Sequence, residues 1–215
     1  MFKRKSFFIT FEGIEGSGKS YQSKKLFKNL KKLNRSIVLT REPGGTKGAE
    51  KIREIILKDY FHKNFNEQFG KYTDTLLYLA SRNEHIRNKI KPALLKKKII
   101  ICDRYTDSTL AYQVYGKGVK KNFVDFIHNY ILDSVKPNLT FILKVNLSKA
   151  LKRLKARKKK NRYDKFSKSF YKKVQKGFIK IAKKDTNKYV ILDNSRDSIE
   201  TEKEILKKTL DKMKA

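Results

Sequence analysis

The sequence has one cysteine, three prolines and no tryptophan, and only 21 acidic residues stand against 54 basic ones. A single cysteine cannot form an internal disulfide, so Cys102, which lies in an apolar run, is expected to be an inert buried thiol. No apolar run approaches the ~20 residues of a membrane span, and the apolar stretch Ser6–Phe11 is too short for a signal sequence. These absences favour a cytoplasmic protein without a membrane segment.

The scarcity of acidic residues leaves a formal net charge of +33. A charge of this size is typical of proteins that bind nucleic acid or anionic membranes. However, 43 of the basic residues are lysines spread along the whole chain, which favours a solvated surface. A surface that also binds polyanions remains an alternative. The 11 arginines are rarer, and their positions carry more information.

Apolar runs alternate with amphipathic stretches along the 215 residues. Strands are predicted over 6–12, 36–40, 99–102, 139–145 and 189–192. Helices are predicted over 20–34, 46–58, most of 67–97, 107–114, 121–132, 148–157, 167–184 and 198–214. Strands that alternate with helices predict an α/β fold, with a five-stranded parallel sheet covered by helices on both faces. We expect one domain, 1–215, with a charged segment at about 152–165.

A phosphate-binding loop follows the first predicted strand and precedes a predicted helix. Its residues fit the pattern G-x-x-x-x-G-K-[ST]: Gly13, Ile14, Glu15, Gly16, Ser17, Gly18, Lys19 and Ser20. The glycines let backbone amides surround the phosphates of ATP, Lys19 reaches the β- and γ-phosphates, and Ser20 offers its hydroxyl to Mg²⁺. The nearest match to a guanine-reading motif, at Asn187, lacks the required acid, so a small kinase is favoured over a GTPase.

Further polar side chains follow the second and third predicted strands. The segment Arg41–Thr46 comes after one strand, and Asp103-Arg104-Tyr105 ends the other. The carboxyl ends of strands form the ligand crevice of open α/β sheets. Arg82 lies one helical turn beyond Tyr78, and Ser108, Tyr112 and Gln113 follow Arg104 closely. Such a crevice has guanidinium groups for a phosphate, an aromatic ring for a base, and polar groups for its edges.

Through these segments, the chain resembles bacterial thymidylate kinases from end to end. The matching residues are Phe11–Ser20, Arg41–Thr46, Tyr78–Arg82, Lys91–Leu94 and Asp103–Gln113. The resemblance implies a P-loop nucleoside monophosphate kinase fold, the substrates ATP and dTMP, Mg²⁺ with the ATP, and a homodimer. It also implies transfer of the γ-phosphoryl group of ATP to dTMP, giving dTDP and ADP.

The resemblance assigns roles around the acceptor nucleotide. Tyr78 matches the aromatic residue that stacks on thymine, where the family more often has Phe, and Arg82 matches the arginine that binds the base. Glu15 matches the acid near the sugar 3′-hydroxyl. Ser108, Tyr112 and Gln113 match the wall beside base and sugar.

The resemblance also assigns roles around the phosphates. Arg41, Arg53 and Arg104 match residues around the monophosphate, Asp103 matches an acid that organises Mg²⁺, and Glu42 matches a conformational anchor of its loop. Together with Lys19, Arg104 is a predicted catalytic residue. His62, His85 and His128 match nothing and receive no role.

The charged segment matches the family's lid over ATP. Some members carry a catalytic arginine in the P-loop, at the position that Gly16 occupies here. Others supply it from the lid, and Arg157 and Arg162 fit that arrangement. Asn161-Arg162-Tyr163-Asp164 resembles the lid signature Asp-Arg-x-Glu, with two departures. We therefore expect Arg157 and Arg162 to be catalytic.

Two other functions remain open at this point. One is a kinase for another nucleotide or for a deoxynucleoside, which the crevice arginines disfavour because a nucleoside is neutral. The other is a basic nucleic-acid-binding protein with a vestigial P-loop, supported by the net charge of +33. We expect no specific nucleic acid partner, because the arginines gather at predicted strand ends.

Overall fold

The computed structural model describes residues 6–33, 35–58, 69–156, 162–195 and 199–214. Five strands form one parallel sheet in the order β2-β3-β1-β4-β5. Their bounds are β1 Phe7–Glu12, β2 Ile37–Arg41, β3 Ile99–Asp103, β4 Leu139–Lys144 and β5 Tyr189–Asp193. The predicted fold class is therefore confirmed, with strand ends within a residue or so of the expected positions.

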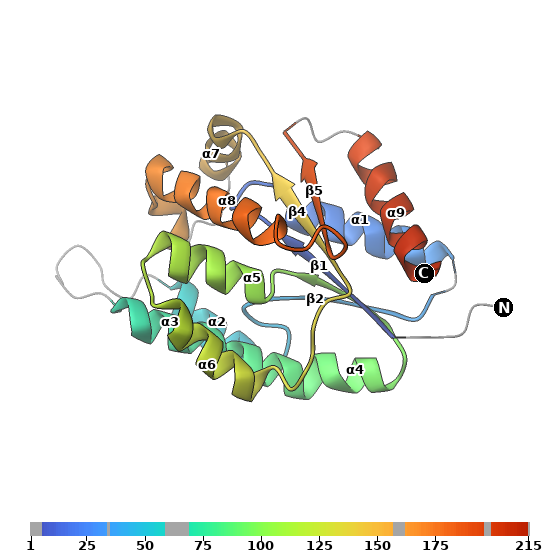
Figure 1. The fold of residues 1–215 in the computed structure, drawn as a ribbon, viewed down its shortest axis with the longest axis horizontal. Coiled ribbons are helices and arrows are strands. Elements are labelled where there is room, and N and C mark those ends of the chain that lie inside the picture. Colours follow the sequence, from blue (N-terminus) through green and yellow to red (C-terminus); the bar gives the residue numbers. More distant parts are fainter. Residues whose placement is uncertain (1–5, 34, 59–68, 157–161, 196–198, 215) are drawn as a thin grey trace.

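Helices cover both faces of this sheet (Figure 1). The longer ones are α1 Lys19–Lys32, α2 Lys47–Leu57, α3 Lys71–His85, α6 Lys121–Ile131, α7 Leu147–Lys155, α8 Lys168–Ala182 and α9 Ile199–Lys214. Shorter segments are α4 Lys91–Leu95, α5 Thr106–Thr109, two π-helical segments, η1 Ile86–Ile90 and η2 Leu110–Gly116, and a 3-10 turn, η3 Arg162–Lys165. Within the described ranges, none of the helices has the length and apolarity that crossing a membrane requires.

The strand β1 shows how the sequence pattern sets the two layers. Its side chains alternate between the faces of the sheet. Ile9 and Phe11 pack with Leu26 and Leu30 of α1 and with Ile205 of α9. Phe8, which precedes Ile9, packs on the other face, in a cluster with η1, α4 and β3. Both faces of this central strand are buried, as expected for a parallel sheet.

The register brings three predicted site segments together at the carboxyl edge of the sheet. Arg41 is paired with Asp103, and Asp103 is paired with Phe11. The pairing continues past the strands, since the amide of Glu42 donates to Asp103 (2.9 Å) and that of Arg104 donates to Phe11 (2.9 Å). The P-loop, the Arg41 loop and the Asp103-Arg104 turn therefore line one crevice.

Candidate functional site

The P-loop is wrapped closely around the place where an anion would bind. Gly13, Gly16 and Gly18 all have positive φ, which a glycine adopts without strain. A Cβ on Gly13 would lie 2.6 Å from the carbonyl oxygen of Leu143, so the loop packs directly against β4. The helix α1 begins at Lys19, within the loop, and its first amides face the same space.

Lys19 lies inside this loop. Its Nζ donates to the carbonyl oxygen of Ile14 (2.6 Å) and to Ser17 Oγ (3.3 Å), and the residue is 5% exposed. Burial and the nearby charge of Arg104 lower the pKa of Lys19 from its usual value to about 7. A buried ammonium group next to a guanidinium group favours the binding of an anion.

Asn194 supports the loop from the end of β5, a role that no sequence motif indicated. The residue is fully buried, and its Nδ2 donates to the carbonyl oxygen of Ser17 (2.8 Å). Its backbone amide donates to Lys144 (2.8 Å), which fixes it to β4. Its side-chain oxygen accepts from Gln22 of α1 (3.3 Å). The P-loop is thus held to both the sheet and its own helix.

Ser20 and Asp103, the two predicted metal ligands, are in contact. Ser20 Oγ donates to Asp103 Oδ2. The second oxygen, Oδ1, is buried and has no hydrogen-bond partner among the described residues. Within the described part of the chain, no group of three or more His, Cys, Asp or Glu side chains could hold a metal ion. One carboxylate and one hydroxyl fit Mg²⁺ that arrives with ATP, because Mg²⁺ keeps few protein ligands beside phosphate oxygens and water.

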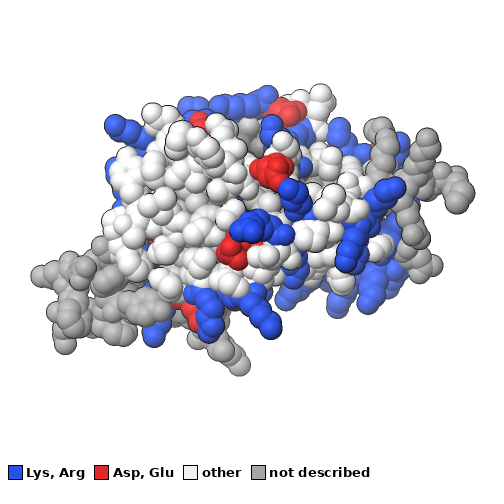
Figure 2. All heavy atoms as spheres, turned by 90° about the horizontal axis from the view of Figure 1, so that it is seen from below, with Lys and Arg blue, Asp and Glu red and all other residues white. Residues whose placement is uncertain are grey.

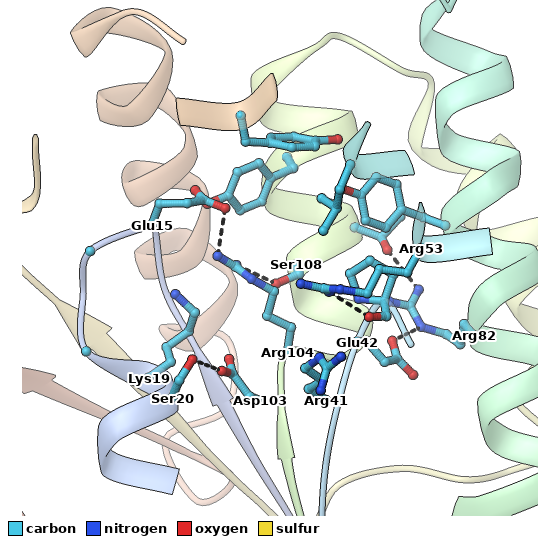
Figure 3. Close-up of a pocket in the computed structure, with 18 of the residues that line it drawn as sticks. Glu15, Lys19, Ser20, Arg41, Glu42, Arg53, Arg82, Asp103, Arg104 and Ser108 are labelled. Carbon is cyan, nitrogen blue, oxygen red and sulfur yellow. Dashed lines mark hydrogen bonds and ion pairs between the residues drawn. The ribbon is translucent and has the colours of Figure 1, made fainter. Parts of the chain in front are cut away.

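Arg104 occupies the centre of the crevice (Figure 3). Its φ is +71°, which is rare for a residue with a side chain. Its guanidinium group donates to the carbonyl oxygen of Gly13 (2.9 Å), to Ser108 Oγ (3.1 Å) and to Glu15 Oε1 (2.9 Å). Burial opposes its charge, but Tyr112 and Glu15 raise its pKa well above the usual value. Arg104 is therefore a fixed cation beside the P-loop.

Glu15 extends from the P-loop toward the same guanidinium group. Its other oxygen, Oε2, accepts a hydrogen bond from the Tyr112 hydroxyl. Burial alone would raise the pKa of Glu15, but Arg104 and Lys19 lower it below the usual value. Glu15 is therefore ionised, and it joins the P-loop to the Tyr112 wall of the crevice.

Glu12 is a site residue that the sequence analysis missed. It ends β1 with no exposed surface, and its carboxyl group accepts from the amide of Tyr105 (2.7 Å) and from Ser108 Oγ (2.6 Å). Burial and the charge of Asp107 raise its pKa to about 8. These bonds fix the turn that carries Arg104. The signals in the sequence were its position at the end of a strand and its place in the matching run Phe11–Ser20, neither of which indicated this role.

Arg82 lies at the inner wall of the crevice and is 2% exposed. Its guanidinium group bonds to Glu42 Oε2 (2.8 Å), Thr109 Oγ1 (2.8 Å), His128 Nε2 (2.9 Å) and the carbonyl oxygen of Tyr105 (2.8 Å). A guanidinium group has five N–H donors, so these four bonds leave one on Nη2. The predicted base-binding arginine is thus nearly saturated by the protein.

Two histidines without an assigned role belong to this buried network. His85 Nδ1 is 3.0 Å from Glu42 Oε1, and its Nε2 is 2.7 Å from Thr40 Oγ1. Burial and the charge of Arg82 lower the pKa of His128 to about 3, so His128 is neutral and its Nε2 accepts from Arg82. The spacing of residues in the sequence could not predict these contacts of His85 and His128, because their partners lie on distant segments. His62 lies outside the described residues.

Arg41 lies at the mouth of the crevice, and the partly buried Arg53 lines its wall. Arg41 donates to Glu50 Oε2 (2.9 Å), and half of its side chain is exposed. Arg53 donates to the carbonyl oxygen of Pro43 (2.7 Å), and burial and the charge of Arg41 lower its pKa. The two guanidinium groups and Arg104 surround one space (Figure 3), as an anionic group would require.

The P-loop and the crevice arginines line one cavity of about 590 Å³. Its walls include the P-loop residues Glu15, Gly16, Gly18, Lys19 and Ser20, the basic residues Arg41, Arg53, Arg82, Arg104 and Arg153, and Asp103, Ser108, Tyr78, Tyr112, Gln113 and Tyr163. The size suits small-molecule ligands. Gln113 Nε2 is buried and without a hydrogen-bond partner among the described residues, so a donor is available to a ligand.

The predicted lid is described only in part. Arg157 lies outside the described residues. Arg162 does not line the cavity, and its Nη2 donates to Asp74 of α3. Arg153 of α7 does line it, and its Nη1 donates to the carbonyl oxygen of Gly16 (2.8 Å). A Cβ on Gly16 would lie 2.6 Å from the carbonyl oxygen of Ala150, so α7 closes the place where a P-loop arginine would start.

Comparisons with known proteins agree on one family. A sequence model described as thymidylate kinase matches residues 11–205. A thymidylate kinase of Sulfurihydrogenibium sp. is 41% identical over 93% of this chain and 95% of its own length. One of Mycoplasma capricolum is 38% identical over 96% of both. The crystal structure of thymidylate kinase from Ehrlichia chaffeensis superposes with a TM-score of 0.74 at 35% identity, over 95% of this chain and 99% of that one.

Proposed function

The chain belongs to the thymidylate kinase family, and from that premise we propose which residues carry out its reaction. The enzyme is a nucleoside monophosphate kinase that transfers the γ-phosphoryl group of ATP to dTMP, giving dTDP and ADP. The observation that carries the residue assignment is one continuous cavity. It joins a P-loop to a pocket with an aromatic wall, a buried amide and several guanidinium groups.

On the donor side, the amides of residues 13–20 bind the ATP phosphates, and Lys19 contacts the β- and γ-phosphates. The phosphates replace the carbonyl oxygen of Ile14 as the partner of Nζ, and their charge returns Lys19 to its protonated form. Ser20 and Asp103 would hold Mg²⁺, and the buried Asp103 Oδ1, which has no hydrogen-bond partner among the described residues, supports this assignment. When bound, Mg²⁺ supplies charge neutralisation at the phosphates.

On the acceptor side, the base of dTMP stacks on Tyr78 and is bound by the remaining N–H of Arg82 and the amide of Gln113. Ser108 and Tyr112 form the wall beside base and sugar, and Glu15 faces the 3′-hydroxyl. Arg41, Arg53 and Arg104 bind the monophosphate. Because the attacking group is already a phosphate, positioning and charge neutralisation carry the reaction.

The transferred group lies between the two nucleotides, where Lys19 and Arg104 counter its charge. The residues at about 152–165 form a lid, and Arg157 and Arg162 are its catalytic arginines. Arg162 must exchange Asp74 for a phosphate to take this role. Arg153 already contacts the P-loop, so it is a third candidate for the same charge. Closure of the lid excludes water from the transfer.

We further propose that the enzyme is a cytoplasmic homodimer that pairs through α3 and α6. Tyr72 and Leu76 of α3 and Phe126 and Tyr130 of α6 are exposed, the last two by 61% and 74%. Figure 2 shows a broad uncharged area on this side of the molecule, with Lys and Arg mostly around it. A second copy that covers this area would remove the apolar side chains from water.

A coupled assay of ADP formation tests the function directly. The acceptors are dTMP, dUMP, CMP, AMP, GMP and thymidine, each at matched concentration with ATP and Mg²⁺. We expect dTMP to give the highest kcat/KM. A higher value with another nucleotide or with thymidine would establish a different acceptor. Salt-sensitive DNA binding without any kinase activity would establish a nucleic-acid-binding protein instead.

A further inference from the structure

Asp74 is a buried acid that does not itself line the cavity. It lies in the first turn of α3 with no exposed surface. A carboxylate that is removed from water must be neutralised by charges of the protein. Two cations do this, since Lys117 Nζ donates to Asp74 Oδ2 (2.7 Å) and Arg162 Nη2 donates to Asp74 Oδ1. One negative charge is therefore shared by two positive charges.

Lys117 approaches Asp74 from a well-fixed position at the end of η2. Its backbone amide donates to the carbonyl oxygen of Tyr112 (2.9 Å), and its side chain is 17% exposed. The hydroxyl of Tyr163 also donates to Asp74 Oδ2 (3.2 Å), and Lys117 Nζ lies 5.4 Å from the centre of the Tyr163 ring. One oxygen of Asp74 thus has a cation and a hydroxyl as partners, without any contribution from Arg162.

Arg162 is bound to Asp74 less completely than a guanidinium group can be. Arg–carboxylate pairs are often bidentate, with two parallel N–H···O bonds. Here the second carboxylate oxygen is used by Lys117 and Tyr163, and Arg162 Nε is buried without a hydrogen-bond partner among the described residues. Arg162 begins η3 and is followed by Tyr163, which lines the cavity. Its guanidinium group is therefore held beside the cavity with unused donor capacity.

We propose that Asp74 is a positioning residue that holds Arg162 beside the cavity while the donor site is empty, and that Lys117 remains as its partner when Arg162 moves to the phosphates of ATP. This inference rests on the proposed role of Arg162 at these phosphates. Without Lys117, the move would leave a buried carboxylate without a cation, which is strongly unfavourable. With Lys117 in place, the charges at Asp74 balance after Arg162 leaves. The affinity for ATP then depends on how firmly Asp74 binds Arg162.

The test is the Kd for ATP with Mg²⁺ and without dTMP, measured by calorimetry on the full chain. Asp74→Asn weakens the bond to Arg162, so the Kd should become about tenfold tighter, the effect of one hydrogen bond to a charged group. Lys117→Met should weaken the Kd by about tenfold, because Arg162 is then the one described cation at Asp74. A purely structural role of the pair would weaken ATP binding in both variants or leave it unchanged, and either result would overturn the proposal.

Two further variants protect this test against other effects of the changes. Asp74→Asn leaves Lys117 buried without an anion, which destabilises the fold. The double variant Asp74→Asn/Lys117→Met removes both charges, and it should also bind ATP about tenfold more tightly; an unchanged Kd would overturn the proposal. Asp133→Asn removes a half-exposed acid that pairs with Lys91 outside the cavity. Its Kd should be unaltered, and an equal gain would show that net charge alone explains the effect.

Arg162→Ala separates a failure of this proposal from a failure of the proposed function. The variant should weaken the Kd for ATP and lower kcat. In Asp74→Asn/Arg162→Ala the gain of Asp74→Asn should disappear, because no arginine remains to be released. If Arg162→Ala changes neither Kd nor kcat, the role of Arg162 at ATP fails. If it weakens ATP binding while Asp74→Asn brings no gain, only the holding role of Asp74 fails.

Discussion

Gly16 tests the claim that this P-loop cannot carry a catalytic arginine. We consider Gly16→Ala, the smallest change that adds a Cβ. The residue has φ +73°, which costs a non-glycine residue about 1–2 kcal/mol. The new Cβ would lie 2.6 Å from the carbonyl oxygen of Ala150, and the shift that this forces costs about 1–3 kcal/mol more. The expected loss in the free energy of unfolding is about 2–5 kcal/mol.

This loss can be measured as a change in Tm. An unfolding entropy of about 2.1 cal/mol/K per residue, over 215 residues, gives roughly 2 °C per kcal/mol, so Tm should fall by about 4–11 °C. Gly118→Ala is the matched control, because Gly118 has φ +69° and no heavy atom within 4 Å of the new Cβ. Its Tm should fall by only about 2–4 °C, since strain alone is added.

The same two variants should also differ in their effect on kinase activity. Gly16→Ala should raise the KM for ATP, because relief of the clash moves the P-loop away from α7, whereas Gly118→Ala should leave it unchanged. Differential scanning fluorimetry and a coupled kinase assay supply both readings. Equal changes in Tm for the two variants, or an unaltered KM for ATP in Gly16→Ala, would refute the reasoning.

Three more predictions follow from the same structure. Asp103→Asn should lower kcat by about 10²-fold and raise the Mg²⁺ concentration needed for half-maximal rate, and an unchanged Mg²⁺ titration would contradict the ligand assignment. The pKa of Lys19 is about 7 in the free protein and bound phosphates raise it, so ATP binding at pH 8 should take up a proton, and the affinity for ATP should fall as pH rises through 7. Calorimetry in buffers of different ionisation enthalpy measures this proton uptake, and its absence would count against the role of Lys19. Phe126→Glu should give a monomer in sedimentation velocity, and an unchanged dimer would exclude the α6 face.

The fold could be predicted closely because its signals are local. β3, Ile99–Asp103, is a run of apolar residues bounded by charges, and such runs indicate central parallel strands. The P-loop is contiguous in sequence, so Lys19 and Ser20 could be assigned a role from spacing alone. The position of Arg104 at a strand end also placed it in the crevice correctly.

The contacts between distant segments could not be predicted in the same way. Asn194 holds the P-loop from 177 positions away, and Glu12 is distinguished from other strand-end acids only by the amides that converge on it. The pairing of Arg162 with Asp74 depends on how η3 returns to α3, which no local pattern specifies. The exposure of Arg41 could not be predicted either, because it depends on Glu50, which holds the half-exposed side chain at the mouth of the crevice.

The most direct test of the account is a crystal structure of the enzyme with a thymidine nucleotide and an ATP analogue in the same cavity. The account predicts the thymine ring stacked on Tyr78, with Arg82 Nη2 within hydrogen-bond distance of the base and the monophosphate among Arg41, Arg53 and Arg104. A thymine ring bound away from Tyr78, or a monophosphate that contacts none of these three arginines, would contradict it.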